Sequence, residues 1–121
     1  MNTPVTWFEI IGQDALKLQA FYSEVFDWNL TPPVPEMGNY SMLDDNNRGS
    51  GIGGGIGHGM EGDSRVTIYI EVDDPDAYLE KVNRAGGKTL MPTSHVTDGV
   101  TIAMFADPDG HVIGLLKANQ G

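Results

Sequence analysis

One carboxylate in this chain has the position expected of a catalytic group. Glu9 lies in the run Trp7-Phe8-Glu9-Ile10, where the alternation of side chains predicts a strand with Trp7 and Glu9 on one face. If that face borders a ligand cavity, a carboxylate held there can serve as a general base. The competing interpretation is a partly solvated Glu9 that hydrogen-bonds to a neighbour such as Tyr69. The sequence leaves both interpretations open.

The three histidines form no recognisable catalytic or metal motif. His58, His95 and His111 lie in or beside predicted loops, and their spacing matches no standard zinc pattern. His111 follows the turn sequence Asp107-Pro108-Asp109-Gly110, so we expect it to stabilise that turn. The absence of cysteine excludes a disulfide framework and a thiol nucleophile.

A glycine-rich segment in the middle of the chain resembles a phosphate-binding loop only superficially. Gly57-His58-Gly59-Met60-Glu61-Gly62 matches the pattern G-x-G-x-x-G. In a phosphate-binding loop, a helix begins directly after this glycine pattern, whereas here the sequence predicts a strand after it. We therefore interpret the segment as a connector, with a phosphate cradle as the less favoured alternative.

The chain is strongly acidic, and the acidity is spread evenly. Its 121 residues carry a net charge of −10. Residues 1–60 contain seven acids and two bases, and residues 61–121 contain ten acids and five, so each half carries −5. An evenly acidic surface repels phosphate backbones and anionic membranes. We expect neither a nucleic acid nor a membrane as partner.

Two further patterns bear on cellular location. The chain has no apolar run of the length that a transmembrane helix needs. Its first residues, Met1-Asn2-Thr3-Pro4, lack the pattern of a signal peptide. We therefore expect a cytoplasmic location.

Hydrophobic periodicity predicts a similar order of elements in each half. In the first half we expect a strand over 5–11, a helix over 15–26 that buries Ala15, Leu18, Tyr22 and Val25, and strands over 28–31, 40–43 and 51–56, with a turn at 44–47. In the second half we expect a strand over 66–72, a helix from Pro75 to Gly86 that buries Tyr78, Leu79, Val82 and Ala85, and strands over 88–91, 101–106 and 112–116.

Each half thus has the order β-α-β-β-β, and the two halves are a sequence repeat. The repeat predicts one α+β domain spanning 1–121, built from tandem modules of about 1–60 and 61–121. The sheet face away from the helices carries mixed polar and apolar residues. We therefore expect a curved mixed sheet around a cavity, since ligand pockets are largely apolar with a few placed polar groups.

Several motifs in this order resemble the vicinal-oxygen-chelate superfamily, which includes glyoxalase I, bleomycin-resistance proteins and extradiol dioxygenases. The chain is most similar to the branch called predicted enzymes related to lactoylglutathione lyase. The motifs are Trp7-Phe8-Glu9-Ile10 with Asp14, Phe21-Tyr22 with Val25-Phe26, the run from Val82 to Gly87, and the run from Phe105 to Gly110.

The resemblance implies a metal centre with His, Gln or Glu side chains at four strand positions. In this chain those positions fall on Trp7, Thr67, Gly114 and, more loosely, Gly53. Tryptophan and glycine side chains supply no ligand, and a neutral threonine hydroxyl is a poor one. We predict no cofactor and no metal residues of the usual kind, although a divalent metal held in another way stays open.

The same face supplies candidate ligand-binding residues. We expect Trp7, Tyr40, Met42, Thr67, Tyr69 and Gly114 to line the cavity, with ordinary core or dimer packing as the alternative for the aromatic members.

Three functions follow from the resemblance. The first is a homodimeric protein, similar to bleomycin-resistance proteins, that binds a small organic molecule without the usual metal. The second is a lyase or isomerase related to lactoylglutathione lyase, with Glu9 as general base. The third is a non-catalytic dimeric interaction module.

Overall fold

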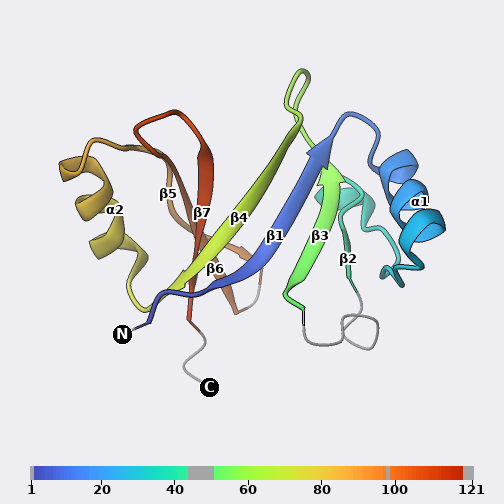
Figure 1. Ribbon diagram of the computed structural model, residues 1–121, viewed down its shortest axis with the longest axis horizontal. Coiled ribbons are helices and arrows are strands. Elements are labelled where there is room, and N and C mark those ends of the chain that lie inside the picture. Colours follow the sequence, from blue (N-terminus) through green and yellow to red (C-terminus); the bar gives the residue numbers. More distant parts are fainter. Residues whose placement is uncertain (1, 44–50, 98, 119–121) are drawn as a thin grey trace. The chain divides into compact units, whose positions relative to one another are not determined.

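The computed structural model describes residues 2–43, 51–97 and 99–118 (Figure 1). The turn predicted at 44–47 lies outside the described residues. The elements, in chain order, are β1 (Val5–Gly12), α1 (Ala15–Phe26), the 3-10 helix η1 (Pro35–Met37), β2 (Ser41–Met42), β3 (Gly53–His58), β4 (Arg65–Val72), α2 (Pro75–Arg84), β5 (Lys88–Thr97), β6 (Val100–Ala106) and β7 (Val112–Lys117). This order confirms the α+β class and the repeated strand-helix-strand modules.

The chain divides into two compact units. The first is Trp7–Thr67, and the second joins Met1–Thr6 to Ile68–Gly121. In the first unit, β3 pairs in parallel with β1, placing Trp7 opposite Gly53 and Glu9 opposite Gly55. On its other side β3 pairs antiparallel with β2. The glycine-rich β3 is therefore the middle strand of this mixed sheet.

The second unit repeats this arrangement with longer strands. Strand β4 pairs in parallel with β7, which places Tyr69 opposite Gly114. Strand β6 then pairs antiparallel with both β7 and β5. Its apolar core contains Val72, Leu79, Ala103 and Leu115. In both units, a parallel pair brings the module's first strand beside its last.

Both helices begin at an aspartate, as their sequences predict. The Asp14 carboxylate accepts a hydrogen bond from the Lys17 amide, 3.1 Å away, and the Asp74 carboxylate accepts one from the Ala77 amide, 3.4 Å away. An N-cap side chain of this kind satisfies a backbone donor that the helix leaves unpaired. The repeat therefore reproduces the helix start together with the strand before it.

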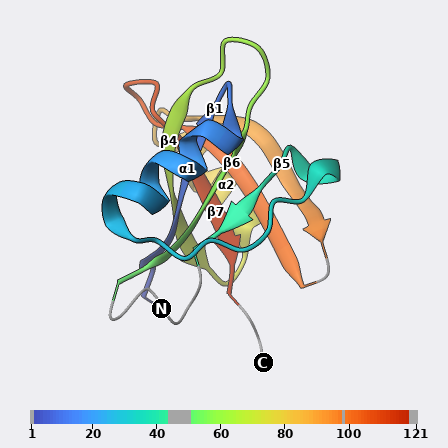
Figure 2. The same ribbon diagram turned by 90° about the vertical axis from the view of Figure 1, so that its right-hand side faces the viewer.

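Helix α1 packs differently from its prediction. It buries Ala15 and Gln19, whereas Val25 is 54% exposed and Leu18 and Tyr22 are half-buried. The Gln19 side-chain amide donates to the backbone oxygens of Asn39 and Ile56, at 2.7 and 2.9 Å. Because a buried carbonyl needs a donor, these bonds turn the Gln19 side of the helix toward β3. Figure 2 views α1 from its outer side.

Helix α2 also departs from its predicted buried stripe. Leu79 is buried, Tyr78 and Val82 are half-buried, and Ala85 is exposed because the helix ends before it. Apolar periodicity thus predicted the helix correctly but did not predict how far each side chain is buried.

Some strand boundaries also shift. The strand predicted over 28–31 is reduced to a single bridge between Leu30 and Leu43. The glycine strand runs from Gly53 to His58, two residues beyond its predicted end, and β5 extends to Thr97 instead of residue 91. No helix in the described part of the chain has the length and apolar character needed to cross a membrane.

Candidate functional site

Three of the predicted site residues meet on one face of the sheet in the first unit. The Trp7 indole nitrogen donates to the Tyr40 hydroxyl, 3.2 Å away, and the Tyr40 hydroxyl donates to Glu9 Oε2, 3.1 Å away. Trp7 and Glu9 come from β1, and Tyr40 precedes β2. Segments more than 30 residues apart therefore join in one hydrogen-bonded chain, with Glu9 at its end.

Arg65 completes this cluster and is not among the site residues predicted from the sequence. Its Nη1 lies 3.5 Å from Glu9 Oε1 and donates to Thr67 Oγ1 at 2.9 Å, while its Nε lies 3.3 Å from an Asp63 carboxylate oxygen. Arg65 precedes Thr67 by two residues in a strand, so both lie on the same face. That spacing was the available signal.

The cluster is largely shielded from solvent. The Glu9 and Arg65 side chains are 14% and 25% exposed. Thr67 is fully buried, and its hydroxyl accepts the hydrogen bond from Arg65. Each Glu9 carboxylate oxygen accepts from a named donor, Tyr40 or Arg65. The arrangement fixes the orientation of one partly buried carboxylate.

The ring of Tyr40 lies over glycines of β3. A β-carbon added at Gly55 or Gly57 would collide with this ring. Met42 lies opposite Gly55 in the β2–β3 pairing, which places it on the Tyr40 face, and its side chain is 45% exposed. The register thus settles the orientation of Tyr40 and Met42, which alternation alone left open.

The second unit has the same combination of a tyrosine over a glycine. Tyr69 is buried, and a β-carbon added at Gly114 would collide with its ring. Gly114 pairs with Tyr69, and Gly55 pairs with Glu9. Because Glu9 and Tyr69 are equivalent in the repeat, the counterpart of Gly114 is Gly55, not Gly53. The sequence alignment of the glycines was off by two residues.

The positions expected to hold metal ligands do not fit a metal of the usual kind. The Trp7 nitrogen is a donor bound to Tyr40, and the Thr67 hydroxyl is bound to Arg65. Tyrosine rings occupy the space that a side chain at Gly55 or Gly114 would need. Among the described residues, no group of three or more His, Asp or Glu side chains could hold a metal ion.

The side chains of His95 and His111 have described partners, and both contacts are local. His111 Nδ1 lies 3.0 Å from an Asp107 carboxylate oxygen. The backbone hydrogen bond from His111 to Asp107 is the main cause that holds the pKa of Asp107 below its ordinary value. His95 Nδ1 lies 2.9 Å from Thr101 Oγ1 across the β5–β6 pair. The first contact supports the predicted role of His111 in its turn.

Comparisons with known proteins identify the family. A Mycobacterium tuberculosis protein named "Putative glyoxylase CFP32" is 32% identical over 98% of this chain and 47% of its own length. A lactoylglutathione lyase of Neisseria meningitidis is 34% identical over 45% of this chain and 40% of its own length. The chain therefore spans about half the length of the curated relatives it matches.

A solved structure shows the same fold. A hypothetical protein from Bacillus halodurans C-125 superposes with a TM-score of 0.73, covers 100% of this chain and 98% of its own, and is 12% identical. The family model described as Glyoxalase/Bleomycin resistance protein/Dioxygenase superfamily matches residues 5–115. The chain belongs to the Glyoxalase/Bleomycin resistance protein/Dioxygenase superfamily.

Proposed function

We propose that this chain binds a small organic molecule on the sheet face that carries Glu9, without the metal that the family resemblance implies. Trp7, Tyr40 and Met42 supply ring and thioether surface for an apolar part of the ligand. The Glu9–Arg65 pair supplies fixed charges for a polar part. This mixture of apolar surface and a few oriented polar groups is typical of small-molecule sites.

The placement of Tyr40 carries this proposal. Its ring fills the space beside Gly55, and its hydroxyl links Trp7 to Glu9. A metal site would need ligand side chains pointing into this space. A hydrogen-bonded aromatic group there favours recognition of an organic ligand.

A thermal-shift screen against a library of small organic molecules, run with and without EDTA, tests the proposal. We expect at least one compound to raise the melting temperature equally in both conditions, because a ligand of the native state stabilises it. The shift should be lost in Trp7→Ala and kept in Met60→Ala, since Met60 is 83% exposed in a turn outside this cluster. A requirement for metal, or a shift that survives Trp7→Ala, would overturn the proposal.

The second candidate is an enzyme in which Glu9 acts as general base. The observation that favours it is the fixed orientation of Glu9 by two donors from different segments. A base must be held within reach of the proton it removes. The named activity of the lactoylglutathione lyase relative gives the first reaction to assay.

Glu9→Gln separates the two candidates, because glutamine still accepts a hydrogen bond from Tyr40 but cannot take a proton. If Glu9 is the base, turnover of the substrate of lactoylglutathione lyase should fall by about 10²–10⁴-fold, with a much smaller change in binding. The conservative Glu9→Asp should retain part of the activity. Unchanged turnover in Glu9→Gln would eliminate this candidate.

The predicted homodimer stays a proposal. Sedimentation analysis of the purified chain over a range of concentrations tests it directly. A single monomeric species at all concentrations would also exclude the third hypothesis, a non-catalytic dimeric interaction module.

A further inference from the structure

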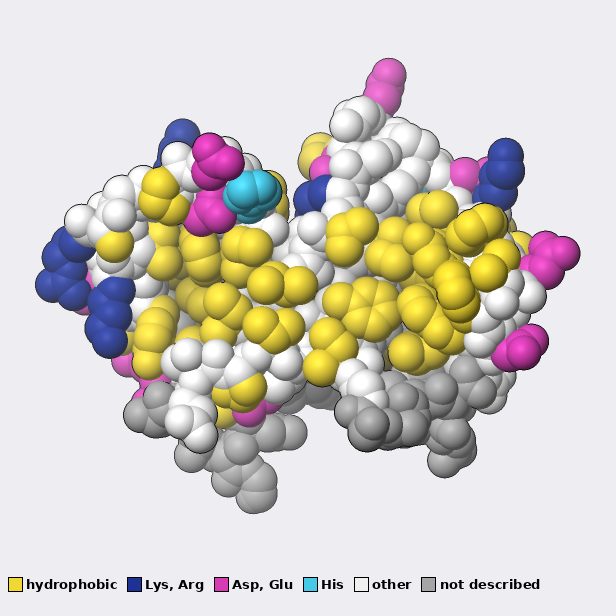
Figure 3. Space-filling model, in the orientation of Figure 1, with side chains coloured by type: hydrophobic (Ala, Val, Ile, Leu, Met, Phe, Trp, Pro, Cys, Tyr) yellow, Lys and Arg dark blue, Asp and Glu magenta, His cyan; other side chains and the backbone are white. Residues whose placement is uncertain are grey.

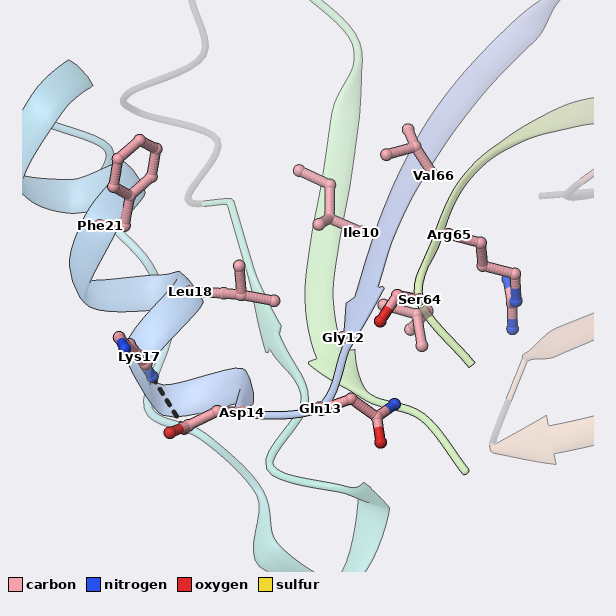
Figure 4. Close-up of a pocket in the computed structure, with 11 residues that line it drawn as sticks. Ile10, Gly12, Gln13, Asp14, Lys17, Leu18, Phe21, Ser64, Arg65 and Val66 are labelled. Atoms are coloured by element: carbon pink, nitrogen blue, oxygen red, sulfur yellow. Dashed lines mark hydrogen bonds between the residues drawn. The ribbon is translucent and has the colours of Figure 1, made fainter. Parts of the chain in front are cut away.

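Helix α1 leaves an open groove beside β1, on the sheet face opposite Glu9. The groove has a volume of about 650 Å³. Leu18 and Phe21 form its wall on the helix, and Ile10 and Val66 form its wall on the strands (Figure 4). Val66 and Arg65 are neighbours in a strand, so their side chains point to opposite faces. Figure 4 accordingly shows Arg65 pointing away from the helix.

The groove exists because α1 packs mainly against β3 and contacts β1 at the C-terminal end of that strand. Ala15 and Gln19 form the buried side of the helix, and Gln19 donates to the Ile56 oxygen of β3. At the C-terminal end of β1, Leu18 packs onto Gly12 so closely that a β-carbon there would collide with it. Beside this contact, Ile10 and Ile11 of β1 line the groove.

The walls of the groove are apolar side chains that stay in contact with water. Phe21 is 53% exposed and Val66 is 72% exposed. Val25 and Phe26 of α1 are also 54% and 56% exposed. Figure 3 shows hydrophobic side chains gathered over the part of this face where α1 lies. Covering such side chains is favourable by about 25 cal/mol per Å². The volume also lies within the range of about 300–1,000 Å³ typical of small-molecule sites.

The charges that line the groove favour an anionic group on the ligand. Lys17 lines it and forms no ion pair among the described residues. The Asp14 carboxylate also lines it, but it caps the N-terminus of α1, where the helix dipole offsets its charge. The Arg65 guanidinium is engaged by Glu9 and Asp63. Lys17 is thus the cation available to a bound molecule.

We propose that this groove binds a small amphipathic anion, with an apolar chain or ring system and one carboxylate or sulfonate group. The apolar body lies against Ile10, Leu18, Phe21 and Val66, and the anionic group lies at Lys17. This site is separate from the one proposed for function, because the two use opposite faces of the sheet.

Two fluorescent probes of nearly the same shape test both parts of the proposal. 8-Anilinonaphthalene-1-sulfonate has an apolar ring system and one anionic group, and N-phenyl-1-naphthylamine lacks the anionic group. We expect saturable binding of the sulfonate probe at one site per chain. Val66→Glu should weaken it by at least about tenfold, because a carboxylate buried against an apolar ligand is costly. Lys17→Gln should weaken it by about two- to fivefold and leave the uncharged probe unchanged, as expected for a solvent-accessible ion pair.

Matched variants exclude indirect effects. Met60→Glu also places a charge at an exposed apolar residue, and Lys88→Gln also removes a surface cation, but neither residue lines the groove. Both should bind the sulfonate probe as the unmodified chain does. Met42→Ala should do the same, since Met42 lies on the other face and does not line the groove. Val66 is exposed, so its substitution leaves the fold intact, which melting curves check directly.

Three results would overturn the proposal. Undiminished probe binding in Val66→Glu would place the probe elsewhere. Loss of binding in Met42→Ala would assign it to the other face. An equal effect of Lys17→Gln on both probes would show that Lys17 does not recognise the anionic group.

Discussion

At the scale of single residues, Arg65 changes how Glu9 is understood. The pair is partly exposed, with 3.5 Å between Arg65 Nη1 and Glu9 Oε1. In a pair shielded to this degree, the cost of removing both charges from water offsets much of their attraction, so the pair is weak evidence for added stability. Its main consequence is therefore geometric, because Arg65 and Tyr40 together hold the carboxylate in one orientation. An oriented carboxylate suits either proposed function, binding of a polar group or removal of a proton.

Asp107 gives a residue-scale prediction about pH. Its pKa is held below the ordinary value of 3.8, chiefly by the backbone hydrogen bond from His111. A carboxyl group with a lowered folded pKa stabilises the protein above its unfolded pKa, and that contribution is lost as pH falls through the folded value. We expect Asp107→Asn to lose less stability than the unmodified chain on acidification from above pH 3.8.

Melting temperatures measured across the acid range check this expectation. Asp109→Asn is the matched control, because Asp109 lies exposed in the same turn and its side chain forms no described bond to His111. It should keep the acid response of the unmodified chain. Identical curves for Asp107→Asn and the unmodified chain would contradict the assignment.

At the scale of elements, β3 depends on the rings that cover it. Tyr40 lies over Gly55 on one face, and Phe8 lies over Gly54 on the other. Gly55→Ala should cost about 1–3 kcal/mol, because an added methyl group must displace the Tyr40 ring. In a Tyr40→Ala background the same substitution should cost nearly nothing, because the space is then open. Urea unfolding of the four proteins in this cycle measures the difference.

Gly54→Ala supplies the control for this cycle. Its added methyl group would meet Phe8 and not Tyr40. Its cost should therefore be the same with and without Tyr40. If Tyr40→Ala failed to relieve Gly55→Ala, the ring would not be what limits side-chain size at that position.

At the scale of the whole molecule, net charge is the dominant electrostatic property. The chain carries −10, and both halves contribute equally. Like charges held in a compact chain repel one another, and salt screens that repulsion. Raising ionic strength from about 0.01 M to about 0.15 M shortens the screening length from about 30 Å to about 8 Å. We therefore expect the melting temperature to rise over this range.

Differential scanning calorimetry with NaCl and with KCl measures this effect. Screening depends on ionic strength, so the two salts should give the same shift. A melting temperature that falls or stays constant as salt is added would show that attractive ion pairs, such as Arg65 with Glu9, outweigh the net repulsion.

The sequence by itself determined the features that depend on neighbouring residues. Strand alternation, helix periodicity and the capping aspartates Asp14 and Asp74 are local, and they sufficed for the α+β class and the order of elements. Because that order repeats, the sequence also supported the family assignment. The face of Trp7 and Glu9 followed from alternation alone.

Only the tertiary structure decided which distant residues meet. Glu9 and Arg65 are 56 positions apart, and Trp7 and Tyr40 are 33 apart. The register of β1 against β3 placed Gly55, not Gly53, opposite Glu9. Gln19, a polar residue, turned one side of α1 toward β3 and left Leu18 and Phe21 beside a groove. Register and long-range hydrogen bonds depend on how separate segments pack together, which local sequence patterns do not contain.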